Sequence, residues 1–153
     1  MIVIRSMQRG DVVPAIQLLI GGALGVTVED PSREAEYWEA VQDIGASGGT
    51  VLVADDDGEV VGICQVFTFR HFQHVGGRAA EVESVHVRAD RRSQGIGEQL
   101  MGAAEEFARQ HGCYRVQLTS NNQRLDAHRF YVRLGYDQSH QGFKKLLPPL
   151  SDA

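Results

Sequence analysis

A glycine loop between a predicted strand and a predicted helix constrains this chain more than any other feature. β-Branched residues alternate up to Val87, and Gly95-Ile96-Gly97 then opens a stretch with apolar residues at helical spacing. The first N–H groups of a helix have no partner inside the helix, and the helix dipole adds positive charge there. Glycines let an anion approach the backbone closely. The junction therefore predicts an anion site with Arg91 and Arg92 beside it, although a tight helix start with solvated arginines would look similar.

Two classes of glycine-loop protein fit the sequence poorly. A phosphate loop of the GxxxxGK[ST] type needs a lysine and a hydroxyl after its second glycine, whereas Glu98 and Gln99 follow Gly97 here. A dinucleotide fingerprint needs a third glycine where Leu100 stands, and a strand that runs straight into the loop. A nucleotide-binding or oxidoreductase domain therefore stays only as an alternative, which a ligand screen distinguishes.

Two motifs carry a resemblance to a known family. Residues 92–97, Arg-Ser-Gln-Gly-Ile-Gly, match R/Q-x-x-G-x-G/A, and residues 127–136 match A-x-x-F-Y-x-x-x-G-[FY]. In both motif and order the chain resembles the GCN5-related N-acetyltransferases (GNAT), firmly from about residue 50 to 147 and loosely before that. The resemblance implies an enzyme that uses acetyl-CoA as a co-substrate. Separately, the sequence shows no secretory or membrane-spanning segment, and from this we expect a soluble, cytoplasmic protein.

The predicted elements agree with that fold. Helices are expected at residues 12–20, 31–44, from 96 onward and at 125–134, and strands at 2–5, 50–54, 60–69, 79–87, 115–120, 136–139 and 142–147. Asp55-Asp56-Asp57-Gly58 predicts a hairpin turn rather than a calcium loop. We therefore expect one domain over residues 1–153, of the mixed α/β class. Its fold is GNAT-like, with a central mixed, mostly antiparallel sheet of six to seven strands and about four flanking helices.

The resemblance also implies which residues hold coenzyme A. Backbone groups of Val85, His86 and Val87 would pair with the pantetheine amides, and the amide of Val85 would also stabilise the oxyanion. The pyrophosphate would rest on the loop residues Arg92, Ser93, Gln94, Gly95, Ile96, Gly97 and Glu98. Arg88 or Arg91 would reach the adenosine phosphate. The family often has Asn where this chain has Arg124, so Asn121 is the substitute candidate for that cofactor contact.

Acetyl transfer to an amine needs a base, and Glu83 occupies the position where related enzymes often hold it. Strict alternation would place Glu81 and Glu83 on one face of the strand and His86 on the other. We expect Glu83 to be partly buried, with a raised pKa that suits a base, and Glu81 to be the second candidate for the base. The alternative is that each is only a surface carboxylate or the partner of a nearby arginine.

Tyr131 matches the position of the tyrosine that protonates the departing thiolate in the resembling family. The alternative is that its side chain only packs in the hydrophobic core against the helix. Cys64 and Cys113 are expected to be buried free thiols, and neither has a neighbouring base that would make it an acyl carrier.

The predicted reaction is direct transfer of acetyl from acetyl-CoA to a primary amine in a ternary complex; the alternative is a non-catalytic acyl-CoA-binding or sensing module. We expect the acceptor to be a small-molecule amine or a peptide N-terminus. The resemblance implies that the two N-terminal helices, with residues 71–77, form the walls of its site. A formal charge of −5 over 153 residues disfavours nucleic acid, and no membrane segment is recognised. No metal is expected, because His71 and His74 lie in a glycine-containing loop. A homodimer through the last strands is a further expectation.

Overall fold

A computed structural model describes residues 1–151 of the chain. The chain forms two compact units, Met1–Leu118 and one that begins at Thr119. The first unit contains the sheet, and the second, as far as residue 151, contains one helix followed by chain without regular structure.

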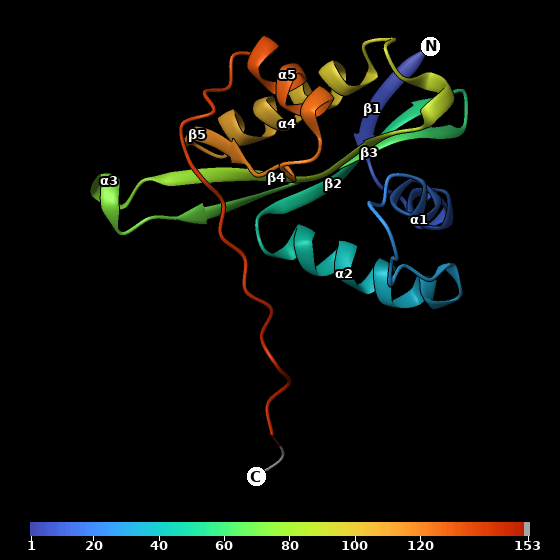
Figure 1. The fold of residues 1–153 in the computed structure, drawn as a ribbon, viewed down its shortest axis with the longest axis horizontal. Helices are drawn as coiled ribbons and strands as arrows, with labels where there is room; N and C mark the ends of the chain where they lie inside the picture. Colours follow the sequence, from blue (N-terminus) through green and yellow to red (C-terminus); the bar gives the residue numbers. More distant parts are fainter. Residues whose placement is uncertain (152–153) are drawn as a thin grey trace. The chain divides into compact units, whose positions relative to one another are not determined.

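The sheet of the first unit has five strands in the order in which they occur along the chain. They are β1 (Ile2–Ser6), β2 (Gly49–Asp56), β3 (Glu59–Arg70), β4 (Arg78–Val87) and β5 (Cys113–Leu118). β1 to β4 pair antiparallel with their neighbours, and β5 pairs parallel with β4 because α4 carries the chain back across the sheet (Figure 1). The predicted mixed, mostly antiparallel sheet is thus confirmed.

Helices cover both faces of this sheet (Figure 1). α1 (Val12–Gly21) and α2 (Glu34–Ala46) lie on one face, where Ala15 and Leu18 pack with Val53 and Ile63. α4 (Ile96–Gln110) lies on the other, where Ile96 and Leu100 pack over Gly62. Because Gly62 and Ile63 are neighbours in β3, their opposite contacts show the pleat of the strand. The remaining short elements are η1 (Arg9–Asp11), η2 (Pro31–Arg33), α3 (Gln73–Gly76) and η3 (Ala89–Arg91).

The two predicted closing strands are wrong, so the sheet has five strands instead of six or seven. After α5 (Leu125–Arg133), residues 136–151 form neither helix nor strand, and most of their side chains are exposed. Their apolar side chains Phe143, Leu146, Leu147 and Leu150 are at least 81% exposed. A strand needs a neighbour for its backbone hydrogen bonds, and a suitable composition does not provide one.

The turn between β2 and β3 is confirmed as the predicted Asp-Gly hairpin. Asp57 and Gly58 both have positive φ angles, of 52° and 94°, as a type I′ turn requires. Asp56 and Glu59 pair across the base of the turn, and the N–H of Gly58 donates to Asp55 Oδ1 at 2.7 Å. The Asp55 carboxylate therefore stabilises the turn through a hydrogen bond.

Arg5 joins β1 to the start of α1. Its guanidinium donates to both carboxylate oxygens of Asp11, at 2.7 and 3.0 Å, and to Asp55 at 2.9 Å. Burial alone would raise the pKa of Asp11, but the hydrogen bonds from Arg5 and from the N–H of Gln8 outweigh it and hold the pKa below its ordinary value.

We predict that Asp11→Asn lowers the free energy of unfolding by about 1–3 kcal/mol at pH 7, because hydrogen bonds to a charged group are lost. Since the pKa of Asp11 is lowered by folding, its stabilisation is present above about pH 4 and is lost as the pH falls below that. Urea unfolding at pH 7 and pH 3 measures both effects. Asp43→Asn, at an exposed position of α2, is the control and should change little; an equal loss at both pH values for Asp11→Asn would contradict the ion-pair explanation.

We also predict opposite effects from two Gly→Ala changes. A Cβ at Gly62 would lie 3.0 Å from Leu100 Cδ1 and 3.1 Å from Ile96 Cγ2, whereas one at Gly102 in α4 meets nothing within 4 Å. Gly62→Ala should therefore destabilise the chain by about 1–3 kcal/mol through overpacking. Gly102→Ala should stabilise it by about 0.5–1 kcal/mol through its helix propensity. Urea unfolding measures both, and a neutral Gly62→Ala would show that α4 can move away from β3.

Candidate active site

A bulge in β4 sets the geometry of the candidate site. Gln65 of β3 pairs with Glu83 and Ile63 pairs with His86, so three steps along β4 oppose two steps along β3. Ser84 takes up the extra residue with a φ of 55°, in the left-handed region. Residues paired across a ladder share a face, so Glu83 and His86 both lie on the face that α1 and α2 cover.

The expectation that His86 faces away from Glu83 is therefore wrong. Strict alternation would have separated them, but the bulge at Ser84 reverses the alternation beyond it. The His86 ring packs against Gly22, at the end of α1: a Cβ on Gly22 would lie 2.2 Å from His86 Nδ1. The paired glycines Gly21-Gly22 are the sequence signal that could have indicated this close approach.

β4 continues past its parallel neighbour. The last pair between β4 and β5 is Val82 with Leu118, and β4 runs on to Val87. The half-buried residues Val85, His86 and Val87 thus lie beyond the end of β5. Along these residues, the edge of β4 that faces β5 has no neighbouring strand from residues 1–151 in the sheet. This arrangement fits an extended ligand lying along β4, as the resemblance requires of pantetheine.

The two candidate carboxylates differ in their surroundings. Glu81 is half-buried and accepts a hydrogen bond from Gln117 Nε2 at 3.1 Å. Glu83 is exposed, so the expected partial burial is wrong: it lies beyond the last pair that β4 shares with β5. Glu81 is thus engaged in a contact between strands, while Glu83 is open to a substrate amine or a water.

The glycine loop starts α4 as the sequence predicts. Gly95 is the N-cap with φ 80° and ψ 5°, a conformation that favours glycine, and Ser93 also has a positive φ of 60°. The N–H of Gln99 is bonded to the carbonyl of Gly95 at 3.1 Å, so the amides of residues 96–98 precede the first helical bond from the cap. Ser93, Gln94, Gly95 and Glu98 are exposed, Gly97 is half-buried and Ile96 is buried against the sheet. The loop therefore offers α4's positive end to an anion.

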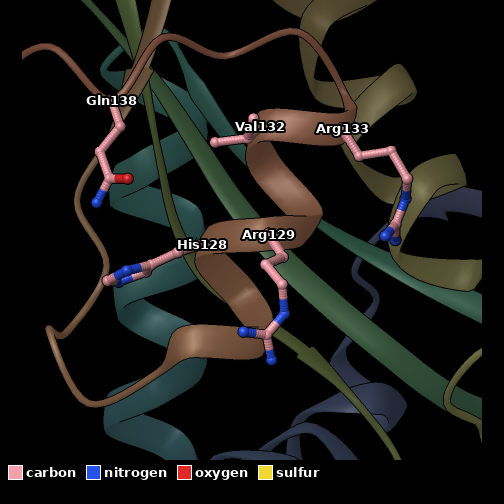
Figure 2. Close-up of a pocket in the computed structure, with 5 residues that line it drawn as sticks. All are labelled: His128, Arg129, Val132, Arg133 and Gln138. Carbon is pink, nitrogen blue, oxygen red and sulfur yellow. The ribbon is translucent and has the colours of Figure 1, made fainter.

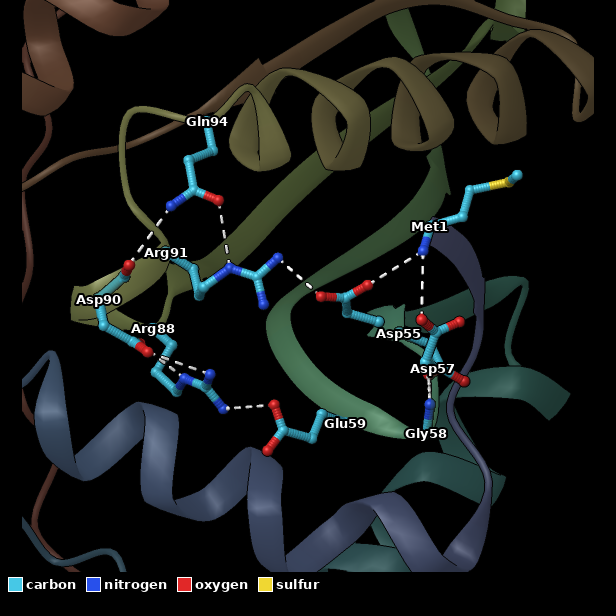
Figure 3. Close-up of polar contacts among 10 residues, drawn as sticks. Met1, Asp55, Asp57, Gly58, Glu59, Arg88, Asp90, Arg91 and Gln94 are labelled. Atoms are coloured by element: carbon cyan, nitrogen blue, oxygen red, sulfur yellow. Dashed lines mark hydrogen bonds and ion pairs between the residues drawn. The ribbon is translucent and has the colours of Figure 1, made fainter.

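The three arginines of this loop have different partners, and Figure 3 draws two of them, Arg88 and Arg91. Arg91 forms an ion pair with Asp56 at 2.8 Å, and Arg88 binds Asp90 at 2.7 Å and Glu59 at 3.3 Å. Arg92 instead donates from Nε to the carbonyl of Val87 at 3.2 Å and stays exposed. Arg92 therefore supplies the exposed cation beside Gly95, and the two arginines expected near the adenosine phosphate bind carboxylates.

The second unit carries Tyr131 and Asn121. The half-buried Tyr131 ring lies 5.1 Å from the Phe130 ring and 6.1 Å from the Tyr136 ring, measured between centroids. The side-chain oxygen of Asn121 accepts from the N–H of Gln123 at 2.9 Å, and its carbonyl lies 2.9 Å from His128 Nε2. Asn121 thus shapes the turn that leads into α5.

A hollow of about 310 Å³ lies on the surface of the second unit (Figure 2). His128, Arg129, Val132, Arg133 and Gln138 line it. The sequence did not single these residues out, because only the helical spacing of the cationic side chains brings them to one side of α5. Arg129 is also paired with Asp126.

Residues 1 to 151 contain neither a metal-binding cluster nor a membrane-spanning helix. Among residues 1 to 151, no three His, Cys, Asp or Glu side chains gather closely enough to bind a metal ion. No helix in the same range combines the length and hydropathy needed to cross a membrane.

Neither cysteine is placed as a nucleophile. Cys64 is fully buried beneath α4, and burial raises the pKa of its thiol to about 12. Burial also raises the pKa of the Cys113 thiol, which is partly exposed in β5. Both thiols are therefore protonated at neutral pH, which disfavours an acyl-cysteine intermediate.

A sheet with a splayed, bulged fourth strand, followed by a glycine loop at the start of a long helix, is the arrangement that the resemblance to acyl-CoA-dependent transferases implies. The sequence matches the Acetyltransferase (GNAT) family over residues 19–136. The chain therefore belongs to the GNAT family of acetyltransferases.

Individual relatives support the same assignment. The chain is 44% identical to an aminoalkylphosphonate N-acetyltransferase of Salmonella typhimurium, over 60% of this chain and 58% of that protein. It is 32% identical to glucosamine 6-phosphate N-acetyltransferase 1 of Oryza sativa, over 69% of this chain and 65% of that protein. These matches thus span less than two thirds of each relative. A solved structure from Bacillus halodurans C-125, described as a transcriptional regulator, has a TM-score of 0.89 and 33% identity, and the match covers 96% of this chain and 100% of that one.

We predict that Ellman's reagent at pH 8 modifies Cys113 slowly and leaves Cys64 unmodified until the chain is unfolded in urea. Burial and the raised pKa of Cys64 are the reasons. Cys64→Ala and Cys113→Ala identify the two thiols: Cys64→Ala should react like the wild type, and Cys113→Ala only after unfolding. Rapid reaction of native Cys113→Ala would show that Cys64 is accessible.

Proposed function

We propose that the protein is an acetyl-CoA-dependent N-acetyltransferase that transfers an acetyl group to a primary amine. The observation that carries the proposal is the pairing of two features in one unit: the bulged β4 that extends past β5, and the glycine loop that starts α4. The first suits an extended thioester arm and the second suits a diphosphate. Membership of the GNAT family supports both assignments.

In this proposal coenzyme A lies along the loop and the strand edge. Its diphosphate rests on the amides of residues 92–98, and the exposed Arg92 adds a positive charge. Val85, His86 and Val87 pair with the pantetheine arm through their backbones. Asn121 stays the candidate for a further cofactor contact.

The chemistry in this proposal follows from the roles that the GNAT family implies for these residues. The lone pair of a neutral amine attacks the thioester carbonyl carbon, and the Val85 N–H stabilises the oxyanion. The carbon–sulfur bond breaks, the amine proton passes to Glu83 directly or through water, and Tyr131 protonates the thiolate. No residue is acylated on this route, in keeping with the protonated thiols of Cys64 and Cys113.

For the acceptor, we propose a small amine that carries a phosphorus oxyanion. The Salmonella relative is named for aminoalkylphosphonate and the rice relative for glucosamine 6-phosphate, and both compounds combine an amine with such an anion. A peptide N-terminus is the other acceptor class to test. A cytoplasmic location and a homodimer stay predictions from the sequence.

A second candidate function is a non-catalytic acyl-CoA-binding module. It is favoured by the Bacillus halodurans structure, which is described as a transcriptional regulator and is similar over 96% of this chain. Such a module would keep the glycine loop but would not depend on Glu83 or Tyr131.

We predict that Glu83→Gln and Tyr131→Phe each lower kcat by about 10²–10⁴-fold, because each removes one proton transfer. Binding of coenzyme A, measured by calorimetry, should stay unchanged. Thiol release from acetyl-CoA with 2-aminoethylphosphonate, glucosamine 6-phosphate and a glycyl peptide measures the activity. Glu81→Gln is the matched control and should keep most of the activity, because Glu81 binds Gln117.

The outcomes separate the candidate functions. Coenzyme A binding without turnover of any amine would favour the binding module. Absence of coenzyme A binding would contradict both. Full activity in both variants would leave the transferase but exclude these two residues from proton transfer.

A further inference from the structure

The turn between β2 and β3 makes ion pairs with the loop between β4 and α4. Asp56 and Glu59 stand opposite each other at the base of the turn, and each carboxylate meets one arginine of the loop. Asp56 Oδ2 lies 2.8 Å from Arg91 Nη2, and Glu59 Oε2 lies 3.3 Å from Arg88 Nη1 (Figure 3). Because the Asp-Gly turn fixes the two carboxylates, it presents them to the loop as a pair.

The same arginines also hold the loop internally. Arg91 Nε donates to Gln94 Oε1 at 3.2 Å, and Gln94 Nε2 donates to the carbonyl of Asp90 at 3.4 Å. Arg88 grips both oxygens of Asp90, at 2.7 and 3.1 Å. The side chain of Arg91 thus connects the turn to Gln94, the residue directly before the N-cap Gly95.

The Arg91 pair is the stronger of the two contacts between turn and loop. The side chains of Arg91 and Asp56 are only 22% and 23% exposed, whereas Glu59 is 66% exposed. The hydrogen bond from Arg91, with a further one from the Met1 ammonium, lowers the pKa of Asp56 below its ordinary value. Asp56 therefore stays ionised at neutral pH and keeps Arg91 turned toward the turn.

We propose that Asp56 is a positioning residue for cofactor binding, which acts through Arg91 to hold the loop in the shape that receives the diphosphate. This inference rests on the proposed function, since it assumes that the loop binds coenzyme A. It assigns Arg91 and Arg88 to the support of the loop and leaves Arg92 as the arginine that meets the ligand. Asp56 would have no contact with the cofactor.

Affinities for coenzyme A and for 3′-dephospho-coenzyme A, measured by calorimetry, test the proposal. Asp56→Asn and Arg91→Gln should each weaken both ligands by the same factor, about twofold to fivefold, because the strength of a partly exposed ion pair sets the effect. The double variant should bind no more weakly than either single variant, since both changes break one contact. Asp56→Glu should restore most of the affinity.

Asp57→Asn is the matched control. Asp57 is the next residue, its side chain is 88% exposed, and its carboxylate lies 3.5 Å from the Met1 ammonium. Asparagine tolerates its left-handed backbone, so the affinities should not change. With an amine that supports turnover, Asp56→Asn should raise KM for acetyl-CoA and leave kcat unchanged, a separation that general destabilisation would not produce.

Two results would overturn the proposal while coenzyme A still binds to the wild type. If Arg91→Gln weakens coenzyme A but not the dephospho form, Arg91 contacts the adenosine phosphate directly. If Asp56→Asn binds both ligands as the wild type does, the ion pair does not shape the loop. A wild type that binds neither ligand would instead contradict the proposed function.

Discussion

The bulge at Ser84 is the constraint on which the site depends. One extra residue in β4 brings Glu83 and His86 to the same face of the sheet, and it lies just past the point where β5 ends. A non-glycine residue with φ of 55° carries a conformational cost, on the order of 1 kcal/mol or more. Without the bulge, β4 would continue as a regular strand, and the side chain of His86 would point away from Gly22. The conformational cost at Ser84 is therefore tied to the geometry of the site.

Local signals predicted those parts of the structure that local chemistry determines. Gly95 starts α4 because few other residues accept its left-handed conformation, and Asp57-Gly58 forms the hairpin turn for a similar reason. The bulge gave no such signal, because serine has no strong preference for a positive φ. The two closing strands were predicted from composition, whereas a strand also needs a neighbour, which composition does not reveal. The partners of Arg88 and Arg91 were missed because Glu59 and Asp56 lie far away along the chain.

The two faces of the sheet divide the proposed roles within the first unit. Gly62 lets Ile96 and Leu100 approach β3 closely, which fixes the start of α4, and with it the loop proposed to bind the diphosphate, against one face. Glu83 and His86 lie on the other face, with α1 and α2. The strand edge at residues 85–87 lies between these faces. A thioester arm that follows this edge would run from the loop toward the carboxylate, so the donor and the acceptor need not compete for the same surface.

The order of the strands also has a consequence for how the chain folds. β2, β3 and β4 follow one another through two hairpins, so the centre of the sheet can form from contacts that are near in sequence. β5 can join only after α4 has crossed the sheet, and closing that longer segment costs more chain entropy. We expect the loop between β4 and α4 to take its final shape in this later step, because it leads directly into α4. A ligand that binds to this loop would therefore bind the completely folded chain and not a partly folded chain that has only the β2–β4 hairpins. Ligand binding would thus stabilise the completely folded state.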